Sequence, residues 1–338
     1  MQTLIVGVGA LGGVIGARLL AARAPVSLAV RDRATADRLR ASGLTVTGVG
    51  GPAQVAVADV APLQEYPASR SFDLVVLATK AHEAMEIAPA LARWLTPGGM
   101  LLPIQNGAFS RILADRLGED RILGGLSNLG ATMHTPGSYE QRNAGHLLVG
   151  ELAGGESARA RQVRDWLGQG VEVRLTPNLG GAIWSKLLLN CSVTTIGAIS
   201  GRTMRAYIAL PEGRAVFDRA YDEALAVALA SGIRPERMMV DPVPPGWDGR
   251  ARPGEAHDRW LDSVLNAYGD IKPSMLQDFE RGRPTEVDFI NGYVTDLGRK
   301  LRVATPVNAA IVEVVQAITR GQLAPDPSVL GRVAASAR

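Results

Sequence analysis

The first half of the chain alternates short apolar runs with helical periodicity. The runs are rich in β-branched residues and end at glycine or polar residues, which is typical of strands buried on both faces of a parallel sheet. We expect such strands at residues 3–8, 26–30, 72–78 and 100–104. A hairpin is expected over residues 44–57, where two further apolar segments flank the turn from Gly48 to Pro52.

The second half has a different pattern. Residues 121–174 predict short strands around a helix at about 157–167, and from Pro177 onward the periodicity is mostly helical. The stretch from Asp241 to Pro253 is rich in proline and glycine and predicts a loop. We therefore place a domain boundary near Pro177, with an α/β domain over residues 1–176 and an all-helical domain over residues 177–338.

A glycine motif joins the first predicted strand to the first predicted helix. It has the form GxGxxG and consists of Gly7, Val8, Gly9, Ala10, Leu11 and Gly12. In this context the first glycine permits a tight turn, the second admits a pyrophosphate to the backbone, and the third lets the helix pack on the strand. The N–H groups of the helix N-terminus then bind the phosphates. The motif predicts a Rossmann-type domain in which these six residues contact a dinucleotide.

The charged segment after the second strand bears on which dinucleotide is bound. An acidic residue at this strand end binds the ribose 2′-OH of NAD, whereas an arginine accommodates the 2′-phosphate of NADP. Arg31 stands at the strand end and Arg33 adds a second positive charge, which favours NADP. Asp32 keeps NAD open as an alternative, and three solvated surface charges are the other alternative.

Two polar residues follow later strands of the predicted sheet. Lys80 comes after the strand at 72–78, and Asn106 after the strand at 100–104. Ligands of an open α/β sheet bind outside the carboxyl ends of its strands, so we expect both side chains to face the cofactor. Asn106 with Gly107 is also a favoured turn pair whatever the function.

An apolar helix is expected over residues 180–199, and it carries one polar stripe. Lys186, Asn190 and Thr194 are four residues apart and share a face. A lysine in such a helix is costly unless it faces a cleft or solvent, and its ammonium can protonate a forming alkoxide. The alternative is a lysine whose stem covers apolar surface while its head reaches solvent. Cys191 is expected to be a small core residue.

A further helix is expected to begin within residues 283–292. Pro284 would lie in its first turn, with Glu286 and Asp288 near the positive end of the helix dipole. Capping alone would explain both carboxylates. No metal is expected, because the four histidines show no ligand spacing; they are His82, His134, His146 and His257.

Composition narrows the class of protein. The 338 residues are 46% hydrophobic and 20% charged, which predicts a globular chain of two domains. The net charge of +3 is small and its basic residues are scattered, so no nucleic-acid partner is expected. No uninterrupted apolar run reaches about 18 residues, so no membrane-spanning helix is expected. A single cysteine excludes an intrachain disulfide, and we expect a cytoplasmic protein.

Taken together, the motifs resemble the ketopantoate reductase (2-dehydropantoate 2-reductase) family. The resemblance covers most of the chain and is most specific where W-x-K-x-x-x-N-C is combined with S-M-L-Q-D and E-x-D-x-I-N-G. The matching segments are Gly7 to Gly12, Thr79 to Ala81, Gln105 to Gly107, Trp184 to Cys191, Pro273 to Asp278 and Glu286 to Gly292.

The resemblance implies roles for individual residues. Lys186 would be the general acid, and Glu286 would contact both the nicotinamide ribose and the lysine network. Cofactor contacts are implied at Arg31, Lys80 and Ala131. Contacts to substrate or cofactor are implied at Asn106, Asn190 and Ser274, with Thr194 on the substrate side.

The sequence departs from the family pattern on that substrate side. Thr194, Met204 and Ile271 stand where the family member compared has asparagines. Losing an amide removes a hydrogen bond of about 0.5–1.5 kcal/mol. A pocket with fewer amides would favour apolar 2-oxo acids, so ketopantoate is expected to be no better a substrate than a more apolar one.

The expected function is the NADPH-dependent reduction of a 2-oxo acid to a 2-hydroxy acid. The first candidate is 2-dehydropantoate to pantoate, a step of pantothenate biosynthesis, with Lys186 as general acid. Two alternatives stay open: a reductase of the same fold that acts on another oxo acid, an imine or a carbonyl compound, and a non-catalytic NADP-binding sensor. A homodimer is the candidate assembly, because a helical second domain often supplies a dimer surface, and no membrane partner is expected.

Overall fold

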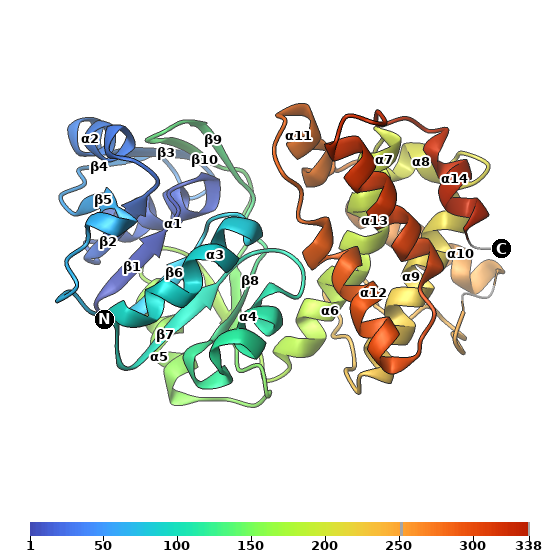
Figure 1. Cartoon of the computed structure of the whole chain (residues 1–338), viewed down its shortest axis with the longest axis horizontal. Helices are drawn as coiled ribbons and strands as arrows, with labels where there is room; N and C mark the ends of the chain where they lie inside the picture. Colours follow the sequence, from blue (N-terminus) through green and yellow to red (C-terminus); the bar gives the residue numbers. More distant parts are fainter. Residues whose placement is uncertain (251–252, 337–338) are drawn as a thin grey trace. The chain divides into compact units, whose positions relative to one another are not determined.

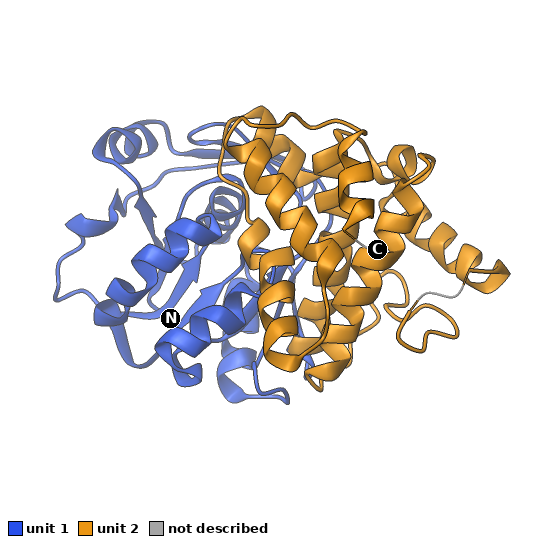
Figure 2. Ribbon diagram, turned by 45° about the vertical axis from the view of Figure 1, so that its right-hand side comes forward, with its two compact units in different colours: residues 1–179 blue, residues 180–338 orange. Residues whose placement is uncertain are grey.

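A computed structural model of the chain describes residues 1–250 and 253–336. The chain divides into two compact units, which we call unit 1 (Met1–Leu179) and unit 2 (Gly180–Arg338) (Figure 2). The division falls just after the position expected at Pro177. Leu179 belongs to unit 1 because its side chain packs so closely on Gly124 that a Cβ there would lie 2.1 Å from Leu179 Cδ2.

Unit 1 is built on a parallel five-stranded sheet with the order β5-β2-β1-β6-β7 (Figure 1). β1 and β2 are buried at every position because their apolar residues face helices on both sides, as the sequence predicts. The strand order reverses direction between β1 and β6, so ligands are expected beside the carboxyl end of β1. The strands are β1 (Thr3–Val6), β2 (Val26–Val30), β5 (Val60–Pro62), β6 (Phe72–Leu77) and β7 (Leu95–Pro103).

Helices and short 3-10 turns connect the strands of this sheet. The buried faces of α1 and α2 carry Val14, Ile15, Leu19 and Leu39, which join the core of unit 1. The helices are α1 (Ala10–Ala21), α2 (Arg33–Ser42), α3 (Ala81–Leu91), α4 (Phe109–Leu117) and α5 (Ala158–Leu167), and the 3-10 turns are Leu63–Glu65, Ala92–Trp94 and Glu119–Arg121.

Two smaller sheets complete unit 1. The expected hairpin is confirmed, because β3 pairs antiparallel with β4 in the register Leu44 to Val55. β3 also pairs in parallel with β10, which joins it to β9 in the order β4-β3-β10-β9, and the other sheet has the order β12-β11-β8. The strands are β3 (Leu44–Gly48), β4 (Ala53–Val55), β8 (Gly124–Ser127), β9 (Ala131–Thr135), β10 (Ser138–Gln141), β11 (Leu147–Gly150) and β12 (Val173–Leu175).

Helices are the only regular secondary structure among the described residues of unit 2, as the sequence predicts. Its core surrounds α6 and α7, where Trp184, Leu188 and Ile196 pack with Phe217 and Ile311. The helices are α6 (Leu179–Leu189), α7 (Thr195–Ser200), α8 (Met204–Ile208), α9 (Gly213–Ala230), α10 (Glu255–Tyr268), α11 (Ser274–Glu280), α12 (Asn291–Leu301), α13 (Pro306–Thr319) and α14 (Val329–Ala335), with a π-helical turn at Asn190–Thr194 and a 3-10 turn at Val287–Phe289.

One expectation about unit 2 is partly wrong. The helix begins at Asn291, within the expected segment 283–292, but Pro284, Glu286 and Asp288 do not lie in its first turn: they precede it in irregular backbone and a 3-10 turn. The reason is tertiary: Ile290, at φ −111° and ψ −97°, breaks the helical path while its side chain is buried in the core.

One helix of unit 2 bears on the expectation that no helix spans a membrane. The helical stretch Leu179–Ser200 is long and apolar enough, by length and composition, to cross a membrane, with a mean hydropathy of 1.3 despite its polar stripe. Of its most apolar window 83% is buried inside the protein, as in a core helix.

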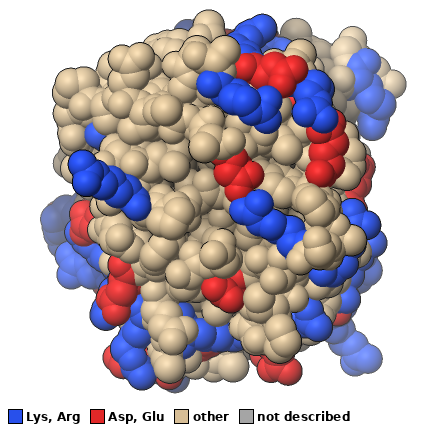
Figure 3. Space-filling view, turned by 90° about the vertical axis from the view of Figure 1, so that its left-hand side faces the viewer, with Lys and Arg blue, Asp and Glu red and all other residues tan. Residues whose placement is uncertain are grey.

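The described part of the loop from Asp241 to Pro253 contains bends and turns, as expected, and residues 251–252 lie outside the described residues. The charge pattern also follows the sequence. On the face drawn in Figure 3, Lys and Arg side chains are mixed with Asp and Glu, and the described residues there form no continuous basic stripe.

Candidate active site

The glycine motif has the geometry of a phosphate-binding turn. Gly7 lies at φ 94°, a conformation that favours glycine, and a Cβ there would lie 2.5 Å from Thr79 Cγ2. A Cβ on Gly12 would lie 2.0 Å from the Gly7 carbonyl oxygen, so this glycine lets α1 approach β1. A Cβ on Gly9 would meet nothing within 4 Å. The backbone at Gly9 is therefore open to a ligand, while the glycines on either side are fixed by packing.

The start of α1 suits an anion. Gly9 is the N-cap, no side chain caps the helix, and its first turn contains no acidic residue. Val8, Ala10 and Leu11 are half-buried, whereas the rest of the helix is mostly buried. The backbone N–H groups and the positive dipole end are thus accessible without a competing carboxylate, which fits a pyrophosphate.

The three charged residues after β2 have different partners in the structure, which the sequence could not show. Asp32 caps α2 by accepting from Thr35 N at 2.8 Å, and this backbone hydrogen bond, before any other cause, holds the pKa of its carboxyl below the usual value. Arg33 pairs with Glu65, so its charge is neutralised rather than added to the site. Arg31 has an 89% exposed side chain with Asp32 3.7 Å away. Of the three, Arg31 is the one available to a 2′-phosphate.

The ends of β6 and β7 are tied together by Gln105, a residue of the matching segments to which the sequence analysis gave no role. Gln105 is buried, and its Nε2 donates to the carbonyls of Leu77 at 3.1 Å and Thr79 at 2.9 Å. This fixes the turns that carry Lys80 and Asn106, which are both half-buried at the carboxyl ends of neighbouring strands. Ala131 begins β9, a strand that packs beside α1.

Tyr139 is the second residue that the sequence did not reveal. Its hydroxyl donates to the Val8 carbonyl at 3.0 Å and accepts from Gly137 N at 3.3 Å. Its ring lies against Gly13, where a Cβ would come within 2.2 Å of it. Burial raises the pKa of this phenol, so it remains a neutral donor. The only hint of this contact in the sequence is a fourth glycine, Gly13, which leaves room for an aromatic ring beside the helix.

In unit 2 the predicted polar stripe is real. From Gly181 to Ser200 every residue is buried except Lys186, Asn190 and Thr194, which are partly exposed. Their spacing places them along one line, and apolar neighbours such as Trp184 and Leu188 face the core. The helix therefore offers a row of one cation, one amide and one hydroxyl to whatever lies beside it.

Lys186 sits in an environment that weakens its positive charge. Burial lowers the pKa of its ammonium to about 8, and the negative charge of Glu286 opposes that shift. Glu286 is itself only 7% exposed and lies just before the 3-10 turn Val287–Phe289. A buried carboxylate that interacts with the desolvated ammonium of a half-buried lysine is not explained by helix capping. An ammonium of this pKa can give up a proton near neutral pH.

Asn190 and Thr194 lie in the π-helical turn and contact each other. Thr194 Oγ1 lies 2.9 Å from the Asn190 carbonyl oxygen and 3.2 Å from Asn190 Oδ1. Asn190 Nδ2 is buried and has no partner in the described protein. The amide therefore presents an unused donor, which suits an oxygen of a ligand.

Comparison with known proteins agrees with both halves of this arrangement. Residues 3–154 match the family model described as ketopantoate reductase PanE/ApbA, and residues 178–319 match its C-terminal model. The chain belongs to the ketopantoate reductase family. The predicted family and the predicted α/β-plus-helical fold are thereby confirmed, and the family is one of NADPH-dependent oxidoreductases.

Individual relatives match over nearly the whole chain. The 2-dehydropantoate 2-reductase of Halobacterium salinarum is 28% identical over 322 residues, covering 95% of this chain and 99% of that enzyme. The structure of 2-dehydropantoate 2-reductase from Geobacter metallireducens is 26% identical, with a TM-score of 0.76 over 96% of this chain and 100% of that one. D-mandelate dehydrogenase with NADH and anilino(oxo)acetate shares the fold, with a TM-score of 0.79 at 22% identity over 95% and 99% of the two chains.

The other positions that the resemblance places on the substrate side are distributed unevenly in this ketopantoate reductase family member. Ser274 is exposed as the first residue of α11, a helix that packs on α7 and the π-helical turn. Ile271 is 56% exposed. Met204 is fully buried in the core of unit 2, so the expectation that it lines a substrate pocket is wrong. Met204 is buried because it is the first residue of α8, which packs against α7.

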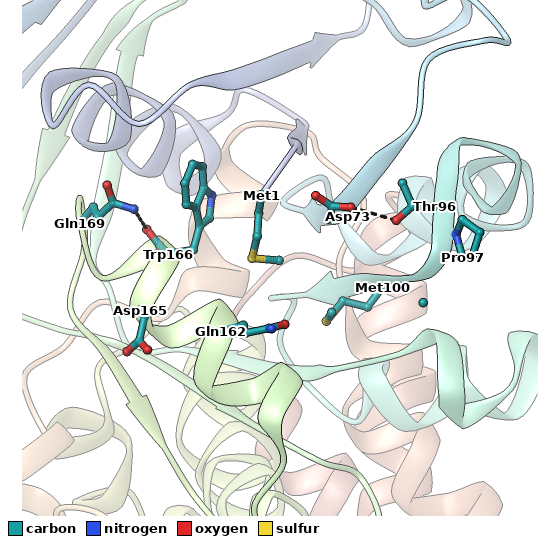
Figure 4. Close-up of a pocket in the computed structure, with 10 residues that line it drawn as sticks. Met1, Asp73, Thr96, Pro97, Met100, Gln162, Asp165, Trp166 and Gln169 are labelled. Atoms are coloured by element: carbon teal, nitrogen blue, oxygen red, sulfur yellow. Dashed lines mark hydrogen bonds between the residues drawn. The ribbon is translucent and has the colours of Figure 1, made fainter.

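The described residues also contain a hollow that is separate from this chemistry. It has a volume of about 570 Å³ and lies at the amino ends of β1, β6 and β7, opposite the strand ends that carry the glycine motif (Figure 4). Figure 4 shows the hydrogen bonds from Thr96 to Asp73 and from Gln169 to the Trp166 carbonyl at the edge of the hollow.

Among the described residues, no three His, Cys, Asp or Glu side chains are grouped as metal ligands would be.

Proposed function

We propose that this chain reduces a 2-oxo acid to a 2-hydroxy acid with NADPH, and that the substrate is 2-dehydropantoate, which becomes pantoate. The observation that carries the proposal is Lys186, an ammonium with a pKa of about 8 in an apolar helix, coupled to the buried Glu286. The names of the relatives supply the substrate, and the polar stripe of unit 2 supplies groups that suit it.

Unit 1 would bind the cofactor. The backbone from Gly7 to Gly12 would hold the pyrophosphate, and Arg31 would hold the 2′-phosphate. Lys80, Asn106 and Ala131 would contact the rest of the molecule near the strand ends. When bound, NADPH supplies the hydride that the carbonyl carbon accepts.

Unit 2 would handle the oxygen and the proton. Lys186 would donate a hydrogen bond from Nζ to the keto oxygen, stabilise the negative charge that develops there, and transfer its proton to it. Glu286 would keep the ammonium protonated until that moment, because its charge raises the lysine pKa against the effect of burial. Asn190 would donate from Nδ2 to a substrate oxygen, and Ser274, Thr194 and Asn106 would orient the remaining polar groups.

The test is a panel assay of NADPH consumption. Purified protein is mixed with NADPH and a series of oxo acids, an imine and larger ketones, and loss of absorbance is followed. Turnover with 2-oxo acids supports the proposal. Turnover with only the imine or larger carbonyls would support the other reductase, and tight NADPH binding with no turnover would support a sensor.

The substrate is decided by comparing ketopantoate with 2-oxo-3-methylbutanoate, which lacks its hydroxymethyl group. Because Met204 is buried in the core, the expectation of an apolar pocket rests on Thr194 and Ile271 alone. Asn190 and the Thr194 hydroxyl remain available to a polar tail. A kcat/KM advantage of about a hundredfold for ketopantoate would support the proposed substrate, and equal values would support the apolar alternative.

Assembly and location are further proposals. We propose a homodimer, supported by the helical second unit and by a dimeric ketopantoate reductase of the same fold from Staphylococcus aureus. Light scattering during gel filtration measures the mass of the assembly. We also propose a cytoplasmic location, supported by a single, buried cysteine.

A further inference from the structure

The long helix of the polar stripe is interrupted by a π-helical turn at Asn190–Thr194. Such turns are rare and occur often at functional sites. In a regular α-helix a step of four residues overshoots a full turn by about 40°, so a row spaced by four drifts around the helix. The wider π-helical turn reduces that drift and keeps Thr194 beside Asn190, at 3.2 Å from Oδ1.

The hydroxyls of Thr194 and Thr195 stabilise the start of this turn. Thr195 Oγ1 lies 2.5 Å from the Cys191 carbonyl oxygen and 3.1 Å from that of Asn190, and Thr194 Oγ1 lies 2.9 Å from the latter. These hydroxyls donate to carbonyl oxygens whose backbone hydrogen bonds are rearranged by the π-helical turn.

Two residues from distant helices hold the same turn from outside. Asn291 Nδ2 donates to the Cys191 carbonyl at 3.1 Å, and the Tyr207 hydroxyl donates to the Ser192 carbonyl at 2.8 Å. Both donors are fully buried. Three successive carbonyls of the turn, those of residues 190, 191 and 192, therefore each accept from a side chain.

Asn291 is itself fixed by a buried polar chain. Its Nδ2 also donates to Asn308 Oδ1 at 2.9 Å, and Asn308 Nδ2 donates to Glu223 Oε2 at 2.8 Å. Glu223 in turn accepts from the backbone N of Val307 and of Asn308, both at 2.9 Å, and so caps α13. Asn291 Oδ1 is buried with no partner. Both amide hydrogens are used while the oxygen is not, so the position requires a donor.

We propose that Asn291 is a positioning residue for the reaction: it holds the π-helical turn so that Asn190 Nδ2 faces a carboxylate or hydroxyl oxygen of the 2-oxo acid. The inference rests on the proposed function. Asn291 is at the start of α12 and acts through the Cys191 carbonyl, directly beside Asn190 in the chain. Thr195 acts on the same turn from within the helix.

A double-mutant cycle between Asn291 and Asn190 tests this. Asn291→Leu keeps the volume and removes the donor, and we expect KM for the oxo acid to rise about tenfold, the size of one lost hydrogen bond. The dissociation constant of NADPH, measured by fluorescence, should not change. In an Asn190→Ala background Asn291→Leu should have no further effect on kcat/KM, because the group it positions is gone.

A second pair of variants guards against misfolding of Asn291→Leu. Thr195→Val removes the hydroxyl and should raise KM in the same way. Thr195→Ser keeps the hydroxyl, so its KM should stay close to that of the wild type. Val315→Ala is the matched control, because it creates a cavity in the core of unit 2 and removes no hydrogen bond of the polar chain. It should lower the melting temperature without changing KM.

Additive effects in the cycle, or equal KM values for Thr195→Val and Val315→Ala, would overturn the inference while leaving the reductase activity in place. Failure of the proposed function is a different result: the wild type then consumes no NADPH with any 2-oxo acid. Crystal structures of the wild type and Asn291→Leu give a readout without activity. The inference expects the turn at 190–194 to revert toward α-helix, and an unchanged π-helical turn contradicts it.

Discussion

The hydroxyl of Tyr139 donates to the carbonyl of Val8 at 3.0 Å, between the first two glycines of the dinucleotide motif. The two residues are 131 positions apart. The glycine loop is therefore not held by its own sequence alone, because a strand of a different sheet braces it from outside.

This brace leads to the first prediction. Tyr139→Phe keeps the ring against Gly13 and removes the hydrogen bond, worth about 0.5–1.5 kcal/mol. We expect NADPH to bind about threefold to tenfold more weakly in a fluorescence titration. Tyr66→Phe is the control, since Tyr66 donates to the Leu28 carbonyl in the same unit but does not touch the loop. Equal losses in both variants would mean that Tyr139 serves stability only.

The second prediction concerns the proposed general acid. Lys186→Ala should lower kcat by about 10²–10⁴-fold, because the ammonium acts in the transition state. NADPH affinity should stay nearly unchanged. Lys272→Ala, which removes a surface lysine paired with Glu280, is the control. A Lys186→Ala kcat within about threefold of the wild type would remove this lysine from the mechanism.

The third prediction is the pH dependence of catalysis. Lys186 must be protonated to act, and its pKa is about 8. We expect kcat/KM to fall as pH rises through this value. In Glu286→Gln the charge that raises the lysine pKa is lost, so the fall should move to lower pH. A profile with the same midpoint in both proteins would show that Glu286 does not act on the lysine.

The fourth prediction is the effect of the same pKa on stability. The folded-state pKa of Lys186 lies below the unfolded value of 10.5, so between about pH 8 and that value the unfolded state binds more protons. Lys186 therefore makes the wild type gain stability as pH rises through this window. Urea unfolding of the wild type and Lys186→Met at several pH values should show a stability difference that favours the variant below pH 8 and shrinks above it.

The fifth prediction concerns cofactor preference. Arg31→Ala should weaken NADPH binding and leave NADH binding little altered, because the exposed guanidinium would pair with the 2′-phosphate. Arg33→Ala is the matched control: its charge is already paired with Glu65, so NADPH affinity should change less. If Arg31→Ala weakened both cofactors alike, its role would be structural.

Local patterns in the sequence were enough to predict much of the fold and part of the candidate site. The alternation of buried strands and helices, the hairpin at Leu44–Val55 and the GxGxxG turn depend on backbone periods and glycine conformations that neighbouring residues set. The stripe of Lys186, Asn190 and Thr194 follows from a spacing of four in an apolar helix. Its specific link to a reductase came from family resemblance, since the spacing alone left a solvent-facing lysine as an equal alternative.

Other features depend on partners far away in the chain. Arg33 could be taken for a phosphate ligand until the fold brought Glu65 to it, and Met204 for a pocket residue until its helix packed into the core. The late start of α12 depends on the burial of Ile290, which outweighs the signals of Pro284 and two carboxylates.

By itself, then, the sequence determined the order of elements, the dinucleotide turn and the polar row, because each is encoded within one or two turns of backbone. Only the tertiary structure decided how strongly Lys186 is desolvated, which of the charged residues after β2 is available, and what holds Asn190. The physical reason is that burial and hydrogen-bond partners are properties of surroundings: Asn291 reaches the Cys191 carbonyl across 100 residues, a pairing that exists only after the helices have packed.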